Sequence, residues 1–270
     1  MSRCIPFVAP TTTKICLGKD YMVDKNKVML RFSKAANSYD EHALVQQEMA
    51  EYLISMLPHG DYARILELGC GTGYLSQLVV KKLRPKSFYL NDISGSMLDR
   101  CALRLSAFGE KCTYVKGDLD TLSIQEKFHL IISNACLQWV PSLKNTLVKY
   151  RNLLLENGIM LFSGFGEDNL IELKSLSGVG LNSETVANVR ACLTSLFPKV
   201  TFHEKRLVCH YENAMALLSS LKSLGVTGLS DHPWTKAEIL RLLAAYEARY
   251  SEKGSVYATW HCYYALLQRS

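Results

Sequence analysis

An apolar run that leads into three alternating glycines constrains this chain more than any other feature. Ile65 to Leu68 read as a buried strand, three glycines follow at alternate positions 69, 71 and 73, and residues 74–80 carry apolar side chains at helical spacing. A strand, a glycine turn and a helix bring the backbone close to a ligand beneath the helix N-terminus. The dinucleotide fingerprint G-x-G-x-x-G has its third glycine one place later. The stretch therefore predicts a ligand site that differs from the dinucleotide-binding site of that fingerprint.

Strands and helices alternate around and after this turn. We expect strands over 63–68, 88–90, 111–116, 129–134 and 159–165, and helices over 74–83, 95–107 and 143–155. Short connections between apolar strands favour right-handed crossovers, a mostly parallel sheet and helices on both of its faces. This pattern predicts a Rossmann-like α/β fold, in which ligands bind at the carboxyl ends of the strands. Polar side chains fall at four predicted strand ends, namely Glu67, Asp92, Asp118 and Asn134.

Regions outside this core show other patterns. Residues 1–27 read as an N-terminal extension, and residues 28–268 read as one domain that opens with a helix over 41–57. The later part of the chain is expected to hold mostly helical cap insertions around 167–197 and 212–250, a strand or bent hairpin arm over 200–211, and a final strand over 256–267.

Composition narrows the classes of protein. The formal net charge of +6 is modest and suits an acidic partner, but no Lys/Arg run with interleaved aromatics predicts nucleic-acid binding. Nine cysteines include no C-x-x-C pair, and the seven histidines show no metal-ligand spacing, so we expect a reducing cytoplasm and no metal. No apolar run is long enough for a membrane span, and the N-terminus makes a poor signal peptide.

The order E-x-G-x-G-x-G resembles the first motif of class I S-adenosylmethionine (SAM) methyltransferases. This resemblance implies SAM as the cofactor, held by the turn that contains Glu67, Gly69, Cys70, Gly71 and Gly73. Such a ligand carries a cationic sulfonium and no pyrophosphate, which suits an acid at the end of the strand.

Three later positions complete the expected cofactor site. Asp92 lies 19 residues beyond Gly73, where an acid can accept hydrogen bonds from both ribose hydroxyls; Ile93 follows it. The resemblance implies that Asp118 accepts the adenine amino group, that the backbone N–H of Leu119 meets a ring nitrogen, and that Asn134 orients the methionine end.

Other segments resemble a narrower family, the malonyl-[acyl-carrier protein] O-methyltransferases of biotin synthesis. The segments that carry this resemblance include Arg31-Phe32-Ser33-Lys34-Ala35-Ala36-Asn37-Ser38-Tyr39-Asp40 with Gln46, Ser133–Trp139, Leu161–Gly166 and Leu217–Val226. The family moves a methyl group from SAM to the free carboxylate of a malonyl group, which a phosphopantetheine arm attaches to an acidic carrier protein. Masking that charge lets fatty-acid elongation enzymes use the product as a primer.

Charge defines the expected mechanism. A malonyl carboxylate is ionised at neutral pH, since its pKa lies at or below about 4, so no general base is expected. Attack on the sulfonium methyl joins an anion to a cation, which a dry and well-aligned pocket favours. Tyr39 is the expected lid, which covers the cofactor and orients the substrate. The candidate substrate-binding residues are Arg31, Gln138, Trp139, Phe165 and Lys222.

Two alternative functions remain open from the sequence. The chain could methylate a small free carboxylic acid, which would require a closed pocket and no basic docking surface. It could also be a non-catalytic assembly factor on the same fold, although intact glycines, Asp92 and Asp118 argue against this.

Overall fold

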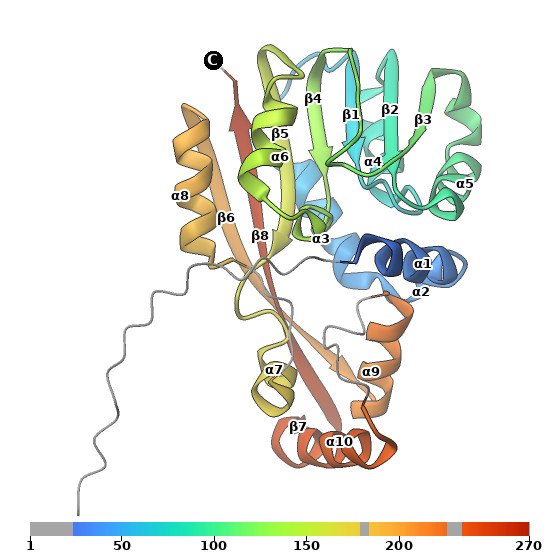
Figure 1. The fold of residues 1–270 in the computed structure, drawn as a ribbon, viewed down its shortest axis with the longest axis vertical. Coiled ribbons are helices and arrows are strands. Elements are labelled where there is room, and N and C mark those ends of the chain that lie inside the picture. The colour runs from blue at the N-terminus through green and yellow to red at the C-terminus, as the bar shows by residue number, and fades with distance from the viewer. Residues whose placement is uncertain (1–23, 179–183, 226–233, 270) are drawn as a thin grey trace, which may run out of the picture.

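The computed structural model describes residues 24–178, 184–225 and 234–269. Its centre is an eight-stranded sheet with the order β3-β2-β1-β4-β5-β8-β6, in which β7 pairs with β8 (Figure 1). The first five strands pair in parallel, β8 runs antiparallel to β5, and β6 runs antiparallel to β8. The mostly parallel Rossmann-like sheet predicted from the sequence is therefore confirmed. The strands are β1 Arg64–Leu68, β2 Ser87–Asp92, β3 Cys112–Lys116, β4 Phe128–Ser133, β5 Leu154–Phe165, β6 Lys199–Tyr211, β7 Ser251–Glu252 and β8 Ser255–Gln268.

Helices precede the sheet, connect its strands and follow it. They are α1 Lys25–Ala35, α2 Tyr39–His42, α3 Leu44–Ser55, α4 Tyr74–Leu83, α5 Gly95–Arg104, α6 Leu143–Arg151, α7 Ile171–Ser177, α8 Val186–Leu196, α9 Ala214–Ser223 and α10 Lys236–Tyr250, with short 3₁₀ turns η1 Ser106–Lys111 and η2 Leu137–Trp139. None of the described helices is long and apolar enough to cross a bilayer.

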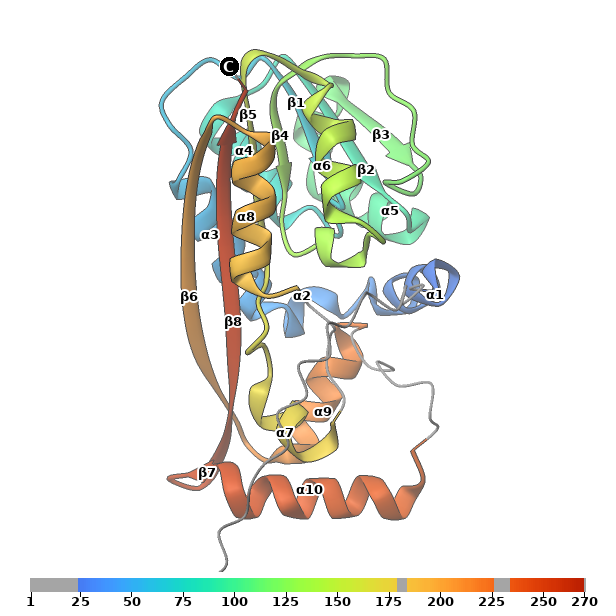
Figure 2. The same cartoon turned by 60° about the vertical axis from the view of Figure 1, so that its left-hand side comes forward.

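Both faces of the parallel sheet are buried, which explains its continuous apolar strands. Successive residues of β1 enter different clusters, because side chains of a strand alternate between the faces. Ile65 belongs to a buried cluster that includes residues of α3, α4 and α5, whereas Leu66 belongs to one that includes residues of α6 and α8. Figure 2 shows α6 and α8 on one side of the sheet and α3 on the other.

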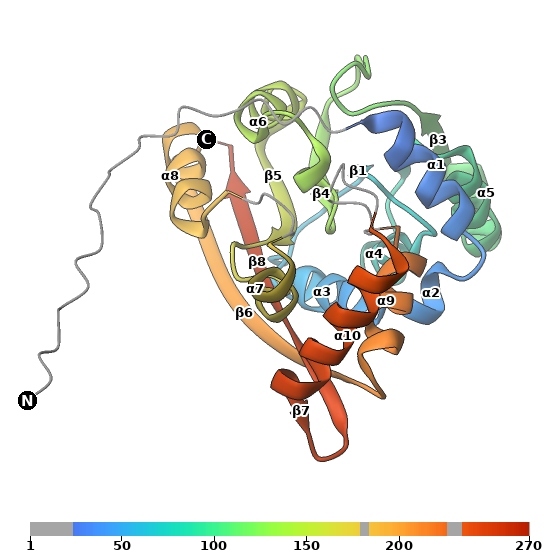
Figure 3. The same cartoon turned by 60° about the horizontal axis from the view of Figure 1, so that its bottom comes forward.

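The long strands β6 and β8 continue below the parallel sheet, where α7, α9, α10 and β7 surround their lower ends (Figures 1 and 3). Buried Glu172 of α7 accepts hydrogen bonds from Thr259 N at 3.0 Å and Thr259 Oγ1 at 2.5 Å, which attaches α7 to β8. These helices fall in the segments expected to be caps. Their contact with a substrate stays a prediction, as do the expected domain boundaries; the first helix begins at Lys25. Residues 1–23 of the expected extension lie outside the described residues.

Three helix predictions were wrong in their bounds or continuity, and the helix expected over 95–107 ends at Arg104, before η1. The helix expected over 41–57 is divided into α2 and α3 at Ala43, whose backbone departs from helical geometry with φ −87° and ψ 32°. The helix expected over 143–155 ends at Arg151, because Leu154 pairs with Phe128 of β4 and its buried side chain joins the sheet. The sequence was compatible with either a strand or a bent hairpin arm over 200–211, and the structure has a single strand there.

Candidate functional site

The four predicted strand-end residues converge at one edge of the sheet. Glu67, Asp92, Asp118 and Asn134 belong to β1, β2 and the segments after β3 and β4, and these four strands are neighbours in the sheet. The chain order reverses at β1, which pairs with β2 on one side and β4 on the other. This reversal is the position at which doubly wound sheets bind ligands.

All three glycines of the turn have positive φ, but their surroundings differ. A β-carbon at Gly69 would overlap Sγ of Cys136, and one at Gly73 would lie 2.7 Å from Sγ of Cys101. No atom lies within 4 Å of the position of a β-carbon at Gly71, where φ is +53°. The expected reason for glycine, close approach to a ligand, therefore applies best to Gly71, whereas Gly69 and Gly73 make room for thiols.

Asp92 holds the glycine turn in place. Its carboxylate accepts a hydrogen bond from Gly71 N at 2.9 Å and from Ser94 N at 2.8 Å. Burial raises the pKa of Asp92 to about 6, although the backbone hydrogen bonds of Ser94, Gly71 and Ile93 act in the opposite direction. The carboxylate thus accepts backbone hydrogen bonds and still lines a cavity.

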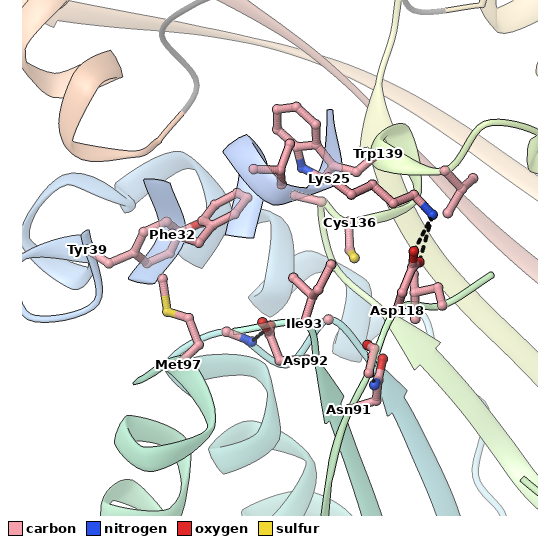
Figure 4. A pocket seen from close by; sticks show the side chains of 17 residues that line it. Lys25, Phe32, Tyr39, Asn91, Asp92, Ile93, Met97, Asp118, Cys136 and Trp139 are labelled. Carbon is pink, nitrogen blue, oxygen red and sulfur yellow. Dashed lines mark hydrogen bonds and ion pairs between the residues drawn. The ribbon is translucent and has the colours of Figure 1, made fainter. Parts of the chain in front are cut away.

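Asp118 is held by a lysine that the sequence did not single out. Nζ of Lys25, at the start of α1, donates to both carboxylate oxygens of Asp118 at 2.7 Å and also contacts Asp120. Figure 4 shows this side chain reaching Asp118 from the helix above the strand ends. Residues 25 and 118 are far apart in the sequence, so no local pattern reveals the pair.

These groups surround a cavity of about 740 Å³, a volume that includes space open to solvent. Ile93, Met97 and Leu119 provide apolar walls, and Asp92 and Asp118 provide carboxylates (Figure 4). An apolar slot with acids at its edge suits a nucleoside, whose ring is flat and whose hydroxyl and amino groups are donors.

A second cavity of about 410 Å³ shares Tyr39, Gly69 and Gly71 with the first. Its lining includes Glu67 and Gln46, each with one buried side-chain oxygen that has no hydrogen-bond partner in the described structure, Oε2 and Oε1 respectively. Burial raises the pKa of Glu67 well above its usual value. Two orphaned acceptors suit the ammonium group of an amino acid, because buried acceptors require partners.

Asn134 borders the second cavity, but its amide is already engaged. Nδ2 donates to the carbonyl of Gln46 at 2.9 Å, and Oδ1 accepts from Ser163 Oγ at 2.6 Å. In this arrangement Asn134 positions Gln46 of α3. Its expected contact with the methionine end of the cofactor stays a prediction.

Tyr39 lies where the two cavities meet, and an aromatic row extends from it. Its ring is 6.2 Å from that of Phe32, which is in turn 5.9 Å from that of Trp139, both in edge contact. Burial, with the charges of Asp92 and Asp40, raises the pKa of Tyr39, so its hydroxyl stays protonated. Phe32 and Trp139 line the larger cavity alone, on the side of α1 and η2 (Figure 4).

Asp40 connects three elements beside Tyr39. Its carboxylate accepts from Thr72 Oγ1 of the glycine turn at 2.6 Å and pairs with Arg104 of α5, and its carbonyl accepts from Gln47 at 2.9 Å. No local pattern in the sequence predicts this network, the role of Lys25 or the orphaned oxygen of Gln46. Only the Tyr-Asp pair in the N-terminal segment signalled that Asp40 had a role.

The structure divides the predicted site residues into two groups. Those that line one or both cavities are Tyr39, Glu67, Gly69, Cys70, Gly71, Asp92, Ile93, Asp118, Leu119, Asn134 and Trp139. Those that line neither are Gly73, which precedes α4, and Arg31, Gln138, Phe165 and Lys222. Among the described residues, no group of three or more His, Cys, Asp or Glu side chains could hold a metal ion.

Four predicted substrate residues lie around the site in different settings. Gln138 donates to the carbonyl of Ala135 at 2.7 Å, and Phe165 is buried 5.6 Å from the ring of Trp260. Arg31 lies near the end of α9, since a β-carbon at Gly225 would be 3.6 Å from its Cβ, and Lys222 is exposed on α9. Their contacts with a substrate stay predictions.

The chain is similar in sequence to known methyltransferases. A family described as "Methyltransferase domain" matches residues 65–158. Malonyl-[acyl-carrier protein] O-methyltransferase 2 of Ilyobacter polytropus is 30% identical over 259 residues, which cover 92% of this chain and 100% of that protein. The Bacteroides fragilis malonyl-[acyl-carrier protein] O-methyltransferase is 32% identical over 244 residues, 88% of this chain, but the match spans only 49% of that protein.

Solved structures share the fold at low sequence identity. YcgJ of Bacillus subtilis has a TM-score of 0.61 at 12% identity, and the match covers 82% of this chain and 98% of that one. N-methyltransferase NodS of Bradyrhizobium japonicum, in complex with S-adenosyl-L-homocysteine (SAH), has a TM-score of 0.54 at 12% identity, with 90% and 98% covered. At these identities the similarity establishes the fold alone.

Proposed function

Because this chain belongs to the malonyl-[acyl-carrier protein] O-methyltransferase family and is a SAM-dependent methyltransferase, we propose that it methylates the free carboxylate of malonyl-[acyl-carrier protein]. The methyl ester would prime pimeloyl and biotin synthesis. The names of the relatives support this choice of substrate, and seven free cysteines among the described residues fit a cytoplasmic enzyme.

One observation carries the placement of the cofactor, namely that the two cavities meet at Tyr39, Gly69 and Gly71. We assign the nucleoside to the larger cavity, where Asp92 accepts from ribose and Asp118 accepts from adenine. We assign the amino-acid end to the smaller cavity, where its ammonium group can donate to the unpartnered oxygens of Glu67 and Gln46. When bound, SAM supplies a methyl group on a positively charged sulfonium.

The residues around the junction position reactants and exclude water, and no base is needed for a substrate that arrives ionised. Tyr39 keeps its proton, so its hydroxyl can donate to a carboxylate. Phe32 and Trp139 keep one side of the junction apolar, which strengthens the attraction between opposite charges. Arg31 and Lys222, on neighbouring helices, are the proposed contacts for the acidic carrier protein.

A transfer assay tests this function directly. The protein is incubated with methyl-labelled SAM and, at equal concentrations, malonyl-carrier protein, malonyl-CoA or malonate. We expect the highest kcat/KM with malonyl-carrier protein and release of the label as methanol in mild base, which identifies an ester. Acetyl-carrier protein is the matched control, because it has the same arm and lacks the carboxylate.

Other results of that assay would favour the alternatives. Label transferred to malonate but not to malonyl-carrier protein would indicate a methyltransferase of small acids. An absence of SAM binding by calorimetry would indicate an assembly role. Equal labelling of acetyl-carrier protein would contradict a carboxylate acceptor.

The affinity for SAH should increase with pH. The pKa of Asp92 is raised to about 6 in the free protein, so its carboxyl is largely protonated at pH 5 and ionised at pH 7. Ribose hydroxyls donate to the ionised form, and binding below pH 6 must therefore displace a proton. Each pH unit below the pKa should cost up to about tenfold in affinity. Calorimetry between pH 5 and 8 measures this change, which Asp92→Asn should reduce; Glu67, whose pKa burial also raises, remains in that variant. Constant wild-type affinity would contradict the prediction.

A further inference from the structure

Helix α1 contributes one face to the larger cavity. Lys25, Val28 and Phe32 all line it, and their spacing of three and four residues places them on the same side of the helix. Lys25 and Phe32 lie across the cavity from Asp92 and Ile93 (Figure 4). A nucleoside in this cavity would therefore be enclosed between α1 and the strand ends.

The contacts that attach α1 to the rest of the protein differ between its two halves. Val28 and Ala35 are its buried residues, and Phe32 in the second half makes edge contacts with Tyr39 and Trp139. Near its C-terminal end, Ser33 Oγ lies 2.8 Å from Ser94 Oγ at the start of α5. At its N-terminal end, Lys25 makes the contacts with Asp118 and Asp120. The N-terminal half of α1 is thus attached mainly by Val28 and one cation.

The environment of that cation makes the contact stronger than an exposed ion pair. The side chains of Lys25, Asp118 and Asp120 are 25%, 26% and 29% exposed, so solvent screens them only partly. Lys25 is also the one lysine or arginine that lines either cavity, within the part of the chain that the structure describes. Without it, two carboxylates two residues apart would repel each other, and Asp118 would keep only the hydrogen bond that its Oδ1 accepts from Asp120 N at 3.0 Å.

We propose that Lys25 is a positioning residue that locks α1 over the bound nucleoside and orients the Asp118 carboxylate toward the adenine amino group. A carboxylate has about four acceptor sites, so Asp118 can accept from both lysine and adenine. Release of SAH then requires the contacts of Lys25 to break. This inference rests on the proposed placement of the nucleoside and not on the identity of the methyl acceptor.

The rate of SAH release tests the proposal without a methyl acceptor. Stopped-flow displacement of SAH, followed through tryptophan fluorescence to which Trp139 in the cavity wall contributes, should be about tenfold faster in Lys25→Ala than in wild type, since charge-assisted contacts are lost. Lys25→Arg should restore a slow rate. Lys27→Ala is the matched control, because Lys27 lies on the same helix with a 62% exposed side chain and should leave the rate unchanged.

Two further readouts separate locking from general damage to the helix. Added salt should accelerate release from wild type more than from Lys25→Ala, because salt screens the ion pair. Hydrogen exchange should show that SAH protects the amides of α1 in wild type and not in Lys25→Ala. An unchanged release rate in Lys25→Ala, or an equal acceleration in Lys27→Ala, would overturn the proposal. No SAH binding to wild type would instead overturn the placement on which it rests.

Discussion

Replacement of Asp92 by asparagine or alanine should weaken SAM binding about 100-fold or more. Two ribose hydroxyls would lose a charged acceptor, and each such hydrogen bond contributes about 1.5–3 kcal/mol. The carboxylate also accepts from Gly71 N and Ser94 N, so its removal loosens the turn beneath the cofactor. Calorimetry with SAM measures the effect.

The asparagine variant keeps this prediction falsifiable. It preserves the shape of Asp92 and one acceptor for the backbone, whereas alanine leaves two buried N–H groups without partners. Thermal unfolding shows which variants remain folded. Asp99→Ala is the control, since Asp99 is an exposed acid on α5. Wild-type affinity in folded Asp92→Asn would refute the ribose assignment.

Gly69→Ala should mainly lower stability, whereas Gly71→Ala should mainly lower the affinity for the cofactor. Alanine at Gly69 combines positive φ with overlap of Cys136 Sγ and should lower the free energy of unfolding by about 3 kcal/mol or more. At Gly71 there is no such overlap, so alanine should cost only about 1–2 kcal/mol of stability for its left-handed conformation.

The affinity for SAM should decrease more in Gly71→Ala than in Gly69→Ala. The β-carbon of Gly71→Ala would lie in open space where the two cavities meet, and we expect it to weaken SAM binding about 10- to 100-fold, as overpacking by 1–3 kcal/mol would. Urea unfolding and calorimetry measure the two quantities separately. Gly109→Ala is the control, because Gly109 has the same open surroundings away from the cavities. Equal effects of Gly69→Ala and Gly71→Ala on both quantities would contradict the distinction.

The mostly parallel sheet and the convergence of the acids could be predicted from the sequence, whereas the strand order comes from the structure. Alternating apolar runs and glycine or polar stops are local signals, and parallel strands must bring their carboxyl ends to one edge. For that reason the sequence predicts Glu67, Asp92 and Asp118 at the same edge, where the structure has them. The ends of elements were less predictable, since Leu154 continues a helical pattern but is buried by pairing with Phe128.

The sequence by itself determined the Rossmann-like sheet, the glycine turn and the acids beside it. The spacing of apolar residues, the backbone conformation of the glycines and the direction of the strands all depend on residues that are neighbours in the chain. Only the tertiary structure decided that Lys25 pairs with Asp118, that Cys136 occupies the space above Gly69, and that α1 encloses the cavity. These contacts join segments separated by dozens of residues. Their energies come from packing and charge in three dimensions, which no local pattern in the chain encodes.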